Sequence, residues 1–330
     1  MQLLGAILAV LSAATFALTN ATGRRGVITG TPAQGMVISM PVGLACFLAL
    51  AFLTGAAQSI GRFGGTALAS LSIAGVLHFV LGRYCNFRAS QAAGVNLTAP
   101  VIQLNSVVTL ILAVVVLREP CTILQAVGAF LMVVGSLAVQ RPAEPATARK
   151  PHKPLELAAF SPRIAAGFFF ASIAALAYGT SPVVIRGTLQ DVGLLGGLVG
   201  GSIAYAAATV AVALGLLIPS LRRNVLQVSS ENARWFTYSG IFVAAAQGFL
   251  YSALAVAPIM LVAPLLQLSL VFRFLFAHLL NPHHEVFGVL VVVGSAVSIA
   301  GACVIAVDTQ LILGALAVPE PLAGLLRSRL

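Results

Sequence analysis

The stretch APVIQL at residues 99–104 returns as APLLQL at residues 263–268. A second series follows each copy, in which one glutamate precedes two glycines at identical spacings: Glu119, Gly128 and Gly135 in the first half, and Glu285, Gly294 and Gly301 in the second. Single matches of alanine or glycine mean little in an apolar chain, but proline, glutamine and glutamate in the same order are hard to obtain by chance. The sequence therefore predicts two copies of one structural unit.

The composition of the 330 residues is that of a membrane protein. Hydrophobic residues make up 59% of the chain and charged residues only 8%, with a mean hydropathy of +1.03, whereas soluble domains have about a quarter of their residues charged. So few charges cannot cover a water-facing surface of this size, which excludes a soluble enzyme, a disordered protein and a disulfide scaffold. The formal net charge of +10 comes mostly from basic residues in short gaps between apolar runs, so it reflects membrane topology and no nucleic-acid partner is expected.

Apolar windows long enough to cross a bilayer recur along the chain, since a transmembrane helix needs about 20 such residues. We predict ten transmembrane helices, near residues 3–22, 33–53, 66–87, 95–117, 122–139, 164–185, 192–217, 235–257, 259–280 and 286–307. Pro258 marks the break between the eighth and ninth, because proline ends a helix. The predicted organisation is a first repeat (1–139), a linker rich in proline and charge (140–163), a second repeat (164–307) and a surface-lying or loosely ordered C-terminal tail (308–330).

An odd number of helices in each repeat makes the second repeat enter the membrane in the opposite sense from the first. The predicted fold class is an all-α polytopic membrane protein whose ten transmembrane helices form two inverted five-helix repeats. Many secondary transporters are built in this way, with the substrate site near the midplane between the repeats. We therefore predict a permease or exporter, and not an enzyme, that moves a small polar or amphipathic metabolite by alternating access. A flippase for lipids or lipid-linked substrates on the same scaffold is the alternative.

Residues 177–182, which read AYGTSP, together with the two proline motifs and the two glutamate–glycine series, resemble the EamA-type permeases of the drug/metabolite transporter superfamily. The resemblance covers nearly the whole chain and implies a ten-helix, multi-pass carrier of small metabolites in the cell membrane (inner or plasma membrane). The family's orientation is the reverse of the one that the basic residues favour, because these are more numerous on the linker face and place the linker in the cytoplasm. Orientation, substrate, direction of transport and coupling ion therefore stay open.

Polar side chains inside a membrane are candidates for a binding site because they are costly in lipid. Gln103 and Gln267 each lie one turn beyond a proline of the repeat, where a loosened helix exposes backbone groups that line a cavity. Arg273 can hold an anionic substrate or extend to the nearer interface. The remaining substrate-binding candidates are Asn20, Tyr84, Arg88, Asn105, Thr180 and Tyr251. The alternative for the polar candidates is a hydrogen bond between helices, and for Arg88 and the nearby Arg83 it is an anchor at the interface.

Titratable residues are scarce within the predicted helices. No Asp or Glu lies well inside one, so proton coupling would use His78 or a carboxylate at a helix end, and without such coupling the chain is a uniporter or exchanger. We expect Glu119 and Glu285 to be structural, because the helix dipole favours a carboxylate at a helix N-terminus.

Ligands other than the substrate are not expected from the sequence. The four cysteines show no metal-ligand spacing, and a metal at His283 and His284 is a less favoured alternative to loop histidines at the interface. We expect no metal and no cofactor. The expected partners are the lipid bilayer and a small-molecule substrate, and the sequence is compatible with a homodimer.

Overall fold

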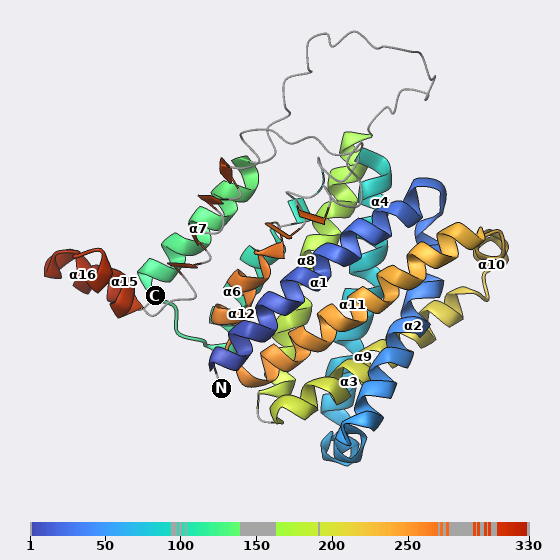
Figure 1. Cartoon of the computed structure of the whole chain (residues 1–330), viewed down its shortest axis with the longest axis horizontal. Coiled ribbons are helices and arrows are strands. Elements are labelled where there is room, and N and C mark those ends of the chain that lie inside the picture. The colour runs from blue at the N-terminus through green and yellow to red at the C-terminus, as the bar shows by residue number, and fades with distance from the viewer. Residues whose placement is uncertain are drawn as a thin grey trace, which may run out of the picture.

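A computed structural model of the chain is helical throughout the part that it describes (Figure 1). The described residues are 2–93, 98, 101–102, 104–138, 163–190, 192–269, 271–272, 275–276, 293–294, 296–297, 300–301, 303–304 and 309–328. No β-strand occurs among them, as the all-α prediction requires.

The helices of the first half follow one another with short connections. They are α1 (Gln2–Thr29), α2 (Pro32–Leu53), the 3-10 helix η1 (Ala56–Arg62), α3 (Gly65–Gly75), the π-helix η2 (Val76–Gly82), α4 (Arg83–Ala93), α6 (Asn105–Leu117) and α7 (Ile123–Ala138). The helices of the second half are α8 (Ile164–Leu189), α9 (Gly193–Gly215), α10 (Pro219–Leu226), α11 (Ser230–Val256), α12 (Ile259–Leu266), α15 (Thr309–Ala315) and α16 (Glu320–Arg327).

Six helical segments within the described residues are long and apolar enough to cross a membrane. They are Gln2–Val27, Pro32–Leu53, Gly65–Ala92, Ile164–Leu189, Gly193–Gly215 and Ser230–Val256, and each coincides with a predicted transmembrane helix. Two shorter apolar helices, Asn105–Leu117 and Ile123–Gly135, fall in the fourth and fifth predicted spans. The ninth predicted span begins with α12, and most of the tenth lies outside the described residues. The chain is thus a multi-pass membrane protein.

Local sequence explains where several of these helices begin and end. Thr31 and Gln34 form a capping box at the start of α2, in which Thr31 Oγ1 accepts from Gln34 N and Gln34 Oε1 accepts from Thr31 N. Between α11 and α12 the helix is interrupted at Ala257 and Pro258, as predicted from the proline.

The two central helices α2 and α9 pack against each other through a reciprocal pair of contacts. Gly43 on α2 faces the ring of Tyr205 on α9, and Gly201 on α9 faces the ring of Phe47 on α2. The centroids of the two rings lie 5.1 Å apart. Because residue numbers rise along α2 while those of their contacts fall along α9, the two helices are antiparallel. Neither glycine has room for a β-carbon, so glycine permits this close approach.

Two other long contacts also join a helix of one half to helices of the other half. Helix α1 runs along α11, where Ser12 Oγ donates to Ala246 O at 2.8 Å and Gly5 lies against Ala257. Helix α8 runs along α3, η2 and α4. The figure shows α1, α2, α9 and α11 side by side in one bundle (Figure 1).

The C-terminal tail was predicted as surface-lying or loosely ordered, and residues 309–328 include two short helices that pack on α7. Leu313 and Ala323 pack against Leu124 near the start of α7, and Ile123 N donates to Ser328 O at 3.1 Å. Figure 1 shows α15 and α16 beside the lower end of α7. The apolar side chains of the tail thus give it a packed position on the surface of the helices.

Candidate solute-binding cavity

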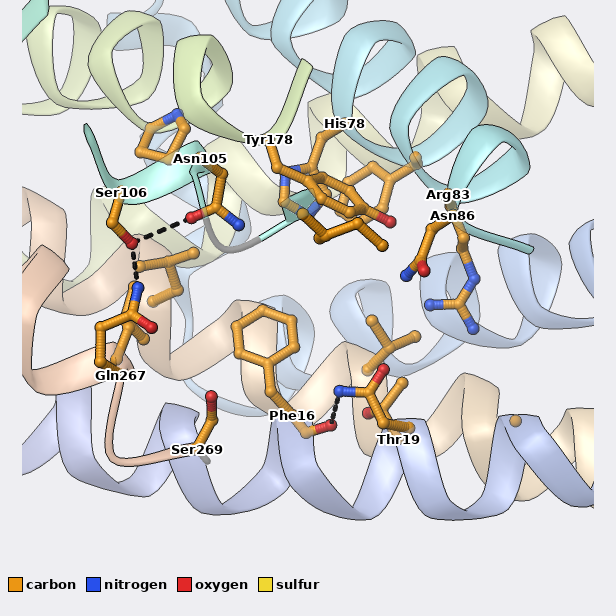
Figure 2. A pocket seen from close by; sticks show the side chains of 18 of the residues that line it. Phe16, Thr19, His78, Arg83, Asn86, Asn105, Ser106, Tyr178, Gln267 and Ser269 are labelled. Atoms are coloured by element: carbon orange, nitrogen blue, oxygen red, sulfur yellow. Dashed lines mark hydrogen bonds between the residues drawn. The ribbon is translucent and has the colours of Figure 1, made fainter. Parts of the chain in front are cut away.

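The helices of both halves enclose a cavity of about 230 Å³ in the middle of the bundle. The first half contributes α1, η2, α4 and α6 to its walls, and the second half contributes α8, α11 and α12. Figure 2 shows Arg83 and Asn86 at one end, Asn105 and Gln267 at the other, and His78 between them. The cavity therefore has polar groups at both ends and in its middle.

His78 lies in the π-helical turn η2, in the middle of the segment that continues from α3 to α4. Its Nδ1 lies 2.7 Å from Ser181 Oγ on α8, and its Nε2 lies 2.6 Å from Gln247 Nε2 on α11. Its ring also packs against that of Tyr178, with centroids 4.7 Å apart. Single π-turns occur frequently at functional sites, and here the turn presents one side chain to two helices of the second half.

Arg83 follows η2 directly and lines the cavity with only 7% of its surface exposed. Its Nη2 donates to Ser239 Oγ at 3.1 Å, and the guanidinium lies 5.2 Å from the centroid of the Phe87 ring. Ser239 Oγ in turn donates to Thr19 O at 3.3 Å. The Nε of Arg83 has no hydrogen-bond partner, and no carboxylate of the described residues lies within 4.0 Å of the guanidinium.

The opposite end of the cavity carries uncharged hydrogen-bonding groups. Gln267 Nε2 donates to Ser106 Oγ, which donates to Asn105 Oδ1 at 3.0 Å. Gln267 is 7% exposed, and its Oε1 has no partner. This end of the cavity is therefore lined by uncharged polar side chains.

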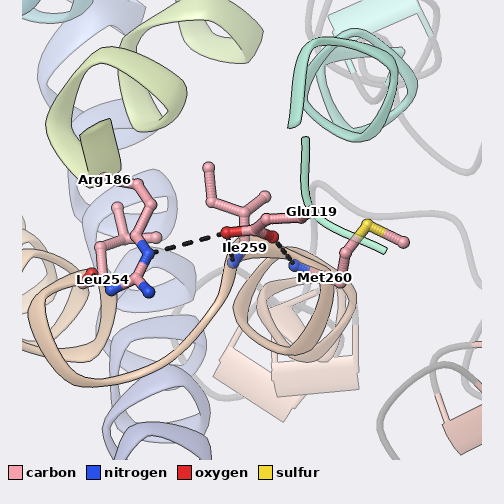
Figure 3. A network of polar contacts seen from close by, with 5 residues as sticks. All are labelled: Glu119, Arg186, Leu254, Ile259 and Met260. Carbon is pink, nitrogen blue, oxygen red and sulfur yellow. Dashed lines mark hydrogen bonds and ion pairs between the residues drawn. The ribbon is translucent and has the colours of Figure 1, made fainter. Parts of the chain in front are cut away.

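Beyond the cavity, Glu119 joins four helices of the bundle (Figure 3). Its two carboxylate oxygens accept from Ile259 N and Met260 N, each at 3.1 Å, and Oε1 lies 3.6 Å from Arg186 Nε. Arg186 Nη1 also donates to Leu254 O at 2.8 Å. The expected carboxylate at a helix N-terminus is present, but the helix is α12 of the second half, because the chain brings the end of α6 beside it. Its repeat counterpart Glu285 lies outside the described residues.

The structure brings four of the predicted residues to the cavity wall: Asn20, His78, Asn105 and Gln267. Asn20 Nδ2 donates to Phe16 O at 3.0 Å. Gln103 and Arg273 lie outside the described residues.

The other predicted site residues lie elsewhere. Tyr84 and Arg88 line a separate groove near the starts of α2 and α10, and Arg88 packs on the ring of Phe170. Thr180 Oγ1 donates to Leu176 O within its own helix. Tyr251 is fully buried against Phe47, so it belongs to the packed core beside the cavity.

Sequence reasoning treated Arg83 as an interface anchor or site residue of low priority and passed over Ser106, Tyr178 and Ser239. A signal was present in the spacing of Arg83, Asn86 and Ser90, which recur at three and four residues and so share one face of a helix. All three line the cavity. Within the described residues there is no group of three or more His, Cys, Asp or Glu side chains that could hold a metal ion.

Comparison with known proteins finds a matching family model and a similar solved structure. Residues 3–140 match the model of the EamA-like transporter family, a range that nearly coincides with the predicted first repeat. A solved structure titled "Crystal structure of protein" is similar with a TM-score of 0.64 and 14% sequence identity, over 96% of this chain and 98% of that one. This likeness shows a shared fold. No curated protein is similar enough in sequence to count as a match. The chain is therefore a multi-pass membrane protein, and residues 3–140 of its 330 are similar to the EamA-like transporter family.

Proposed function

We propose that the protein is a secondary transporter that moves a small polar or amphipathic solute through the central cavity by alternating access. The observation that carries this proposal is the cavity itself, because helices of both halves form its walls and polar side chains from both halves reach it. A site at the contact between two repeats is the arrangement that lets one site face the two sides of the membrane in turn.

The antiparallel packing of α2 and α9 supports two inverted halves. Gly43 and Phe47 on α2 correspond to Gly201 and Tyr205 on α9 in spacing and in kind, and each glycine meets the aromatic ring of the other pair. Reciprocal contacts of this kind arise around a two-fold axis. We therefore assign α2 and α9 as counterparts in two oppositely oriented five-helix units.

The position of the cavity supports a state that is closed at one end. Its lining on α1 runs from Phe16 to Val27, which is the C-terminal half of that helix. The N-terminal half of α1 lies beside Ala257, next to the Glu119 network. In our proposal the Glu119–Arg186 pair closes this end, and the solute enters from the end where α4 ends and α8 begins.

In this proposal four side chains contact the solute: Asn20, His78, Asn105 and Gln267. His78 is also the candidate for coupling, because its ring nitrogens connect helices of both halves. The lipid flippase stays an untested alternative, since no described feature favours it over a solute carrier.

Flux of metabolites in liposomes that contain the purified full-length protein tests the proposal. Asn105→Trp would fill the cavity and should abolish flux, whereas Ile111→Trp places the same side chain on the exposed face of the same helix and should leave flux intact. Equal folded yields of the two variants, measured by size-exclusion chromatography, would make the comparison valid. Normal flux in Asn105→Trp would contradict transport through this cavity.

A further inference from the structure

Arg83 brings an uncompensated positive charge into the cavity. It is only 7% exposed, and among the described residues its side chain hydrogen-bonds to the neutral hydroxyl of Ser239. The ion pairs among the described residues are Arg186 with Glu119 and Arg327 with Glu320, so neither involves Arg83. A buried guanidinium without a counter-charge is unfavourable, and its Nε has no partner within the protein.

We propose that the solute supplies the missing charge: the cavity binds a small monocarboxylate whose carboxylate pairs with Arg83. The inference rests on the proposed transport function and names the class of substrate. The Arg83 side chain lines the cavity, and a carboxylate is the planar oxyanion that accepts from an arginine most effectively. Asn86 lies beside Arg83 in the cavity, and its side-chain amide can donate to the second oxygen (Figure 2).

The charge balance favours a monoanion over a dianion or a zwitterion. Arg24 also lines the cavity and has an interaction of its own, so our proposal assigns the solute's charge to Arg83. A phosphate ester would bring an excess negative charge into a low-dielectric space. An α-amino acid would bring an ammonium group, and the described lining contains no Asp or Glu to receive it.

The rest of the cavity indicates the shape of the solute. Val243, Leu250, Leu254 and Val262 make part of the lining apolar, which suits an apolar body attached to the carboxylate. The free Oε1 of Gln267 lies at the far end. A hydroxyl at the distal end of the acid would lie beside the side chains of Asn105 and Gln267.

A thermal-unfolding assay on the full-length protein in detergent tests the proposal with matched probes. The series runs from acetate through butanoate and hexanoate to hydrocinnamate, each compared with its carboxamide at equal ionic strength. Phenylalanine and phenethyl phosphate keep the ring and change the charge. We expect at least one monocarboxylate to raise the unfolding temperature by several degrees and its amide, the amino acid and the phosphate ester to have no comparable effect.

Arg83→Gln should abolish that stabilisation, and Arg83→Lys should retain part of it because the charge remains. In the absence of solute, Arg83→Gln should unfold at a higher temperature than the unmodified protein, since it removes an uncompensated charge, whereas a structural arginine would make the variant less stable. Arg88→Gln is the matched control, because Arg88 lies on the same helix outside the cavity, and it should leave the response to carboxylates unchanged.

The outcomes separate this proposal from the transport function. Amides that stabilise as well as acids, a response that persists in Arg83→Gln, a preference for phosphate esters or phenylalanine, or no response to any acid in the series would each overturn the monocarboxylate. After such a result the transport function would still hold if the protein moved a neutral solute and Asn105→Trp blocked that flux. If no probe and no metabolite moved across the liposome membrane, the proposed function itself would fail.

Discussion

Two arginines lie inside the same helical bundle in opposite electrostatic situations. Arg186 is 17% exposed and lies 3.6 Å from the carboxylate of Glu119, which also caps α12. Arg83 is more deeply buried, and its partners among the described residues are the hydroxyl of Ser239 and the ring of Phe87. The protein thus pairs Arg186, which holds helices together, with a carboxylate. Arg83, which lines the cavity, has no carboxylate partner among the described residues.

The largest expected effect comes from removing the counter-charge of Arg186. Glu119→Ala leaves the partly buried Arg186 without its carboxylate and two N–H groups of α12 uncapped, so it should lower the free energy of unfolding by about 3 kcal/mol. Thermal or denaturant unfolding in detergent would measure this loss. Glu320→Ala is the control, because the Glu320 side chain of the Glu320–Arg327 pair is 81% exposed, and it should cost less than about 1 kcal/mol. Equal losses in the two variants would contradict the structural role of Glu119.

A second substitution would place a carboxylate near Arg83, as Glu119 already lies near Arg186. Asn86→Asp is nearly isosteric and places a carboxylate three residues away on the same helix, so it should raise the unfolding free energy by about 1–2 kcal/mol and remove the response to monocarboxylates. Gln91→Glu adds the same charge on α4 outside the cavity and should do neither. A destabilised Asn86→Asp protein would show that the field at this end is not positive.

The smallest expected effects come from replacing each arginine by lysine, which keeps the positive charge and changes the geometry of the donors. Arg186→Lys should cost about 1 kcal/mol, because lysine cannot contact Glu119 and Leu254 O with the geometry of a guanidinium. Arg83→Lys should change stability in the absence of solute by no more than about 0.5 kcal/mol, since Arg83 makes a single hydrogen bond to a neutral partner. The same unfolding assay compares the two, and the reverse order would contradict the assignment of roles.

Much of the fold follows from the sequence, because long apolar runs and their breaks are local signals. The runs that became α1, α2, α8, α9 and α11 were predicted as membrane spans. The π-turn η2 was not predicted, since its extra residue per turn leaves no mark in an apolar pattern. The contact of the tail with α7 was also not predicted, because it depends on partners far away in the sequence.

The site was harder to predict than the fold. Asn20, His78, Asn105 and Gln267 are polar residues in apolar surroundings, which the sequence shows directly, and they line the cavity. Whether a polar side chain faces the cavity or the surface depends on the rotation of its helix. For this reason Thr180 and Arg88 satisfied the same criterion and lie elsewhere.

Which charged side chains form ion pairs could not be predicted from the sequence. Nothing in the spacing of Glu119 and Arg186 indicates that they meet, and nothing indicates that Arg83 lacks such a partner. Both facts depend on the packing of helices from the two halves.

The most direct test of the account is the accessibility of the cavity from the two sides of the membrane. Asn20→Cys, in a chain whose four native cysteines are replaced by serine, would be labelled with a membrane-impermeant maleimide in vesicles of each orientation. The account predicts labelling mainly from the end where α4 ends and α8 begins, and a rise in labelling from the Glu119 end when Glu119→Gln weakens the pair with Arg186. Labelling from one side alone, unchanged by Glu119→Gln, would contradict a cavity that opens alternately to both.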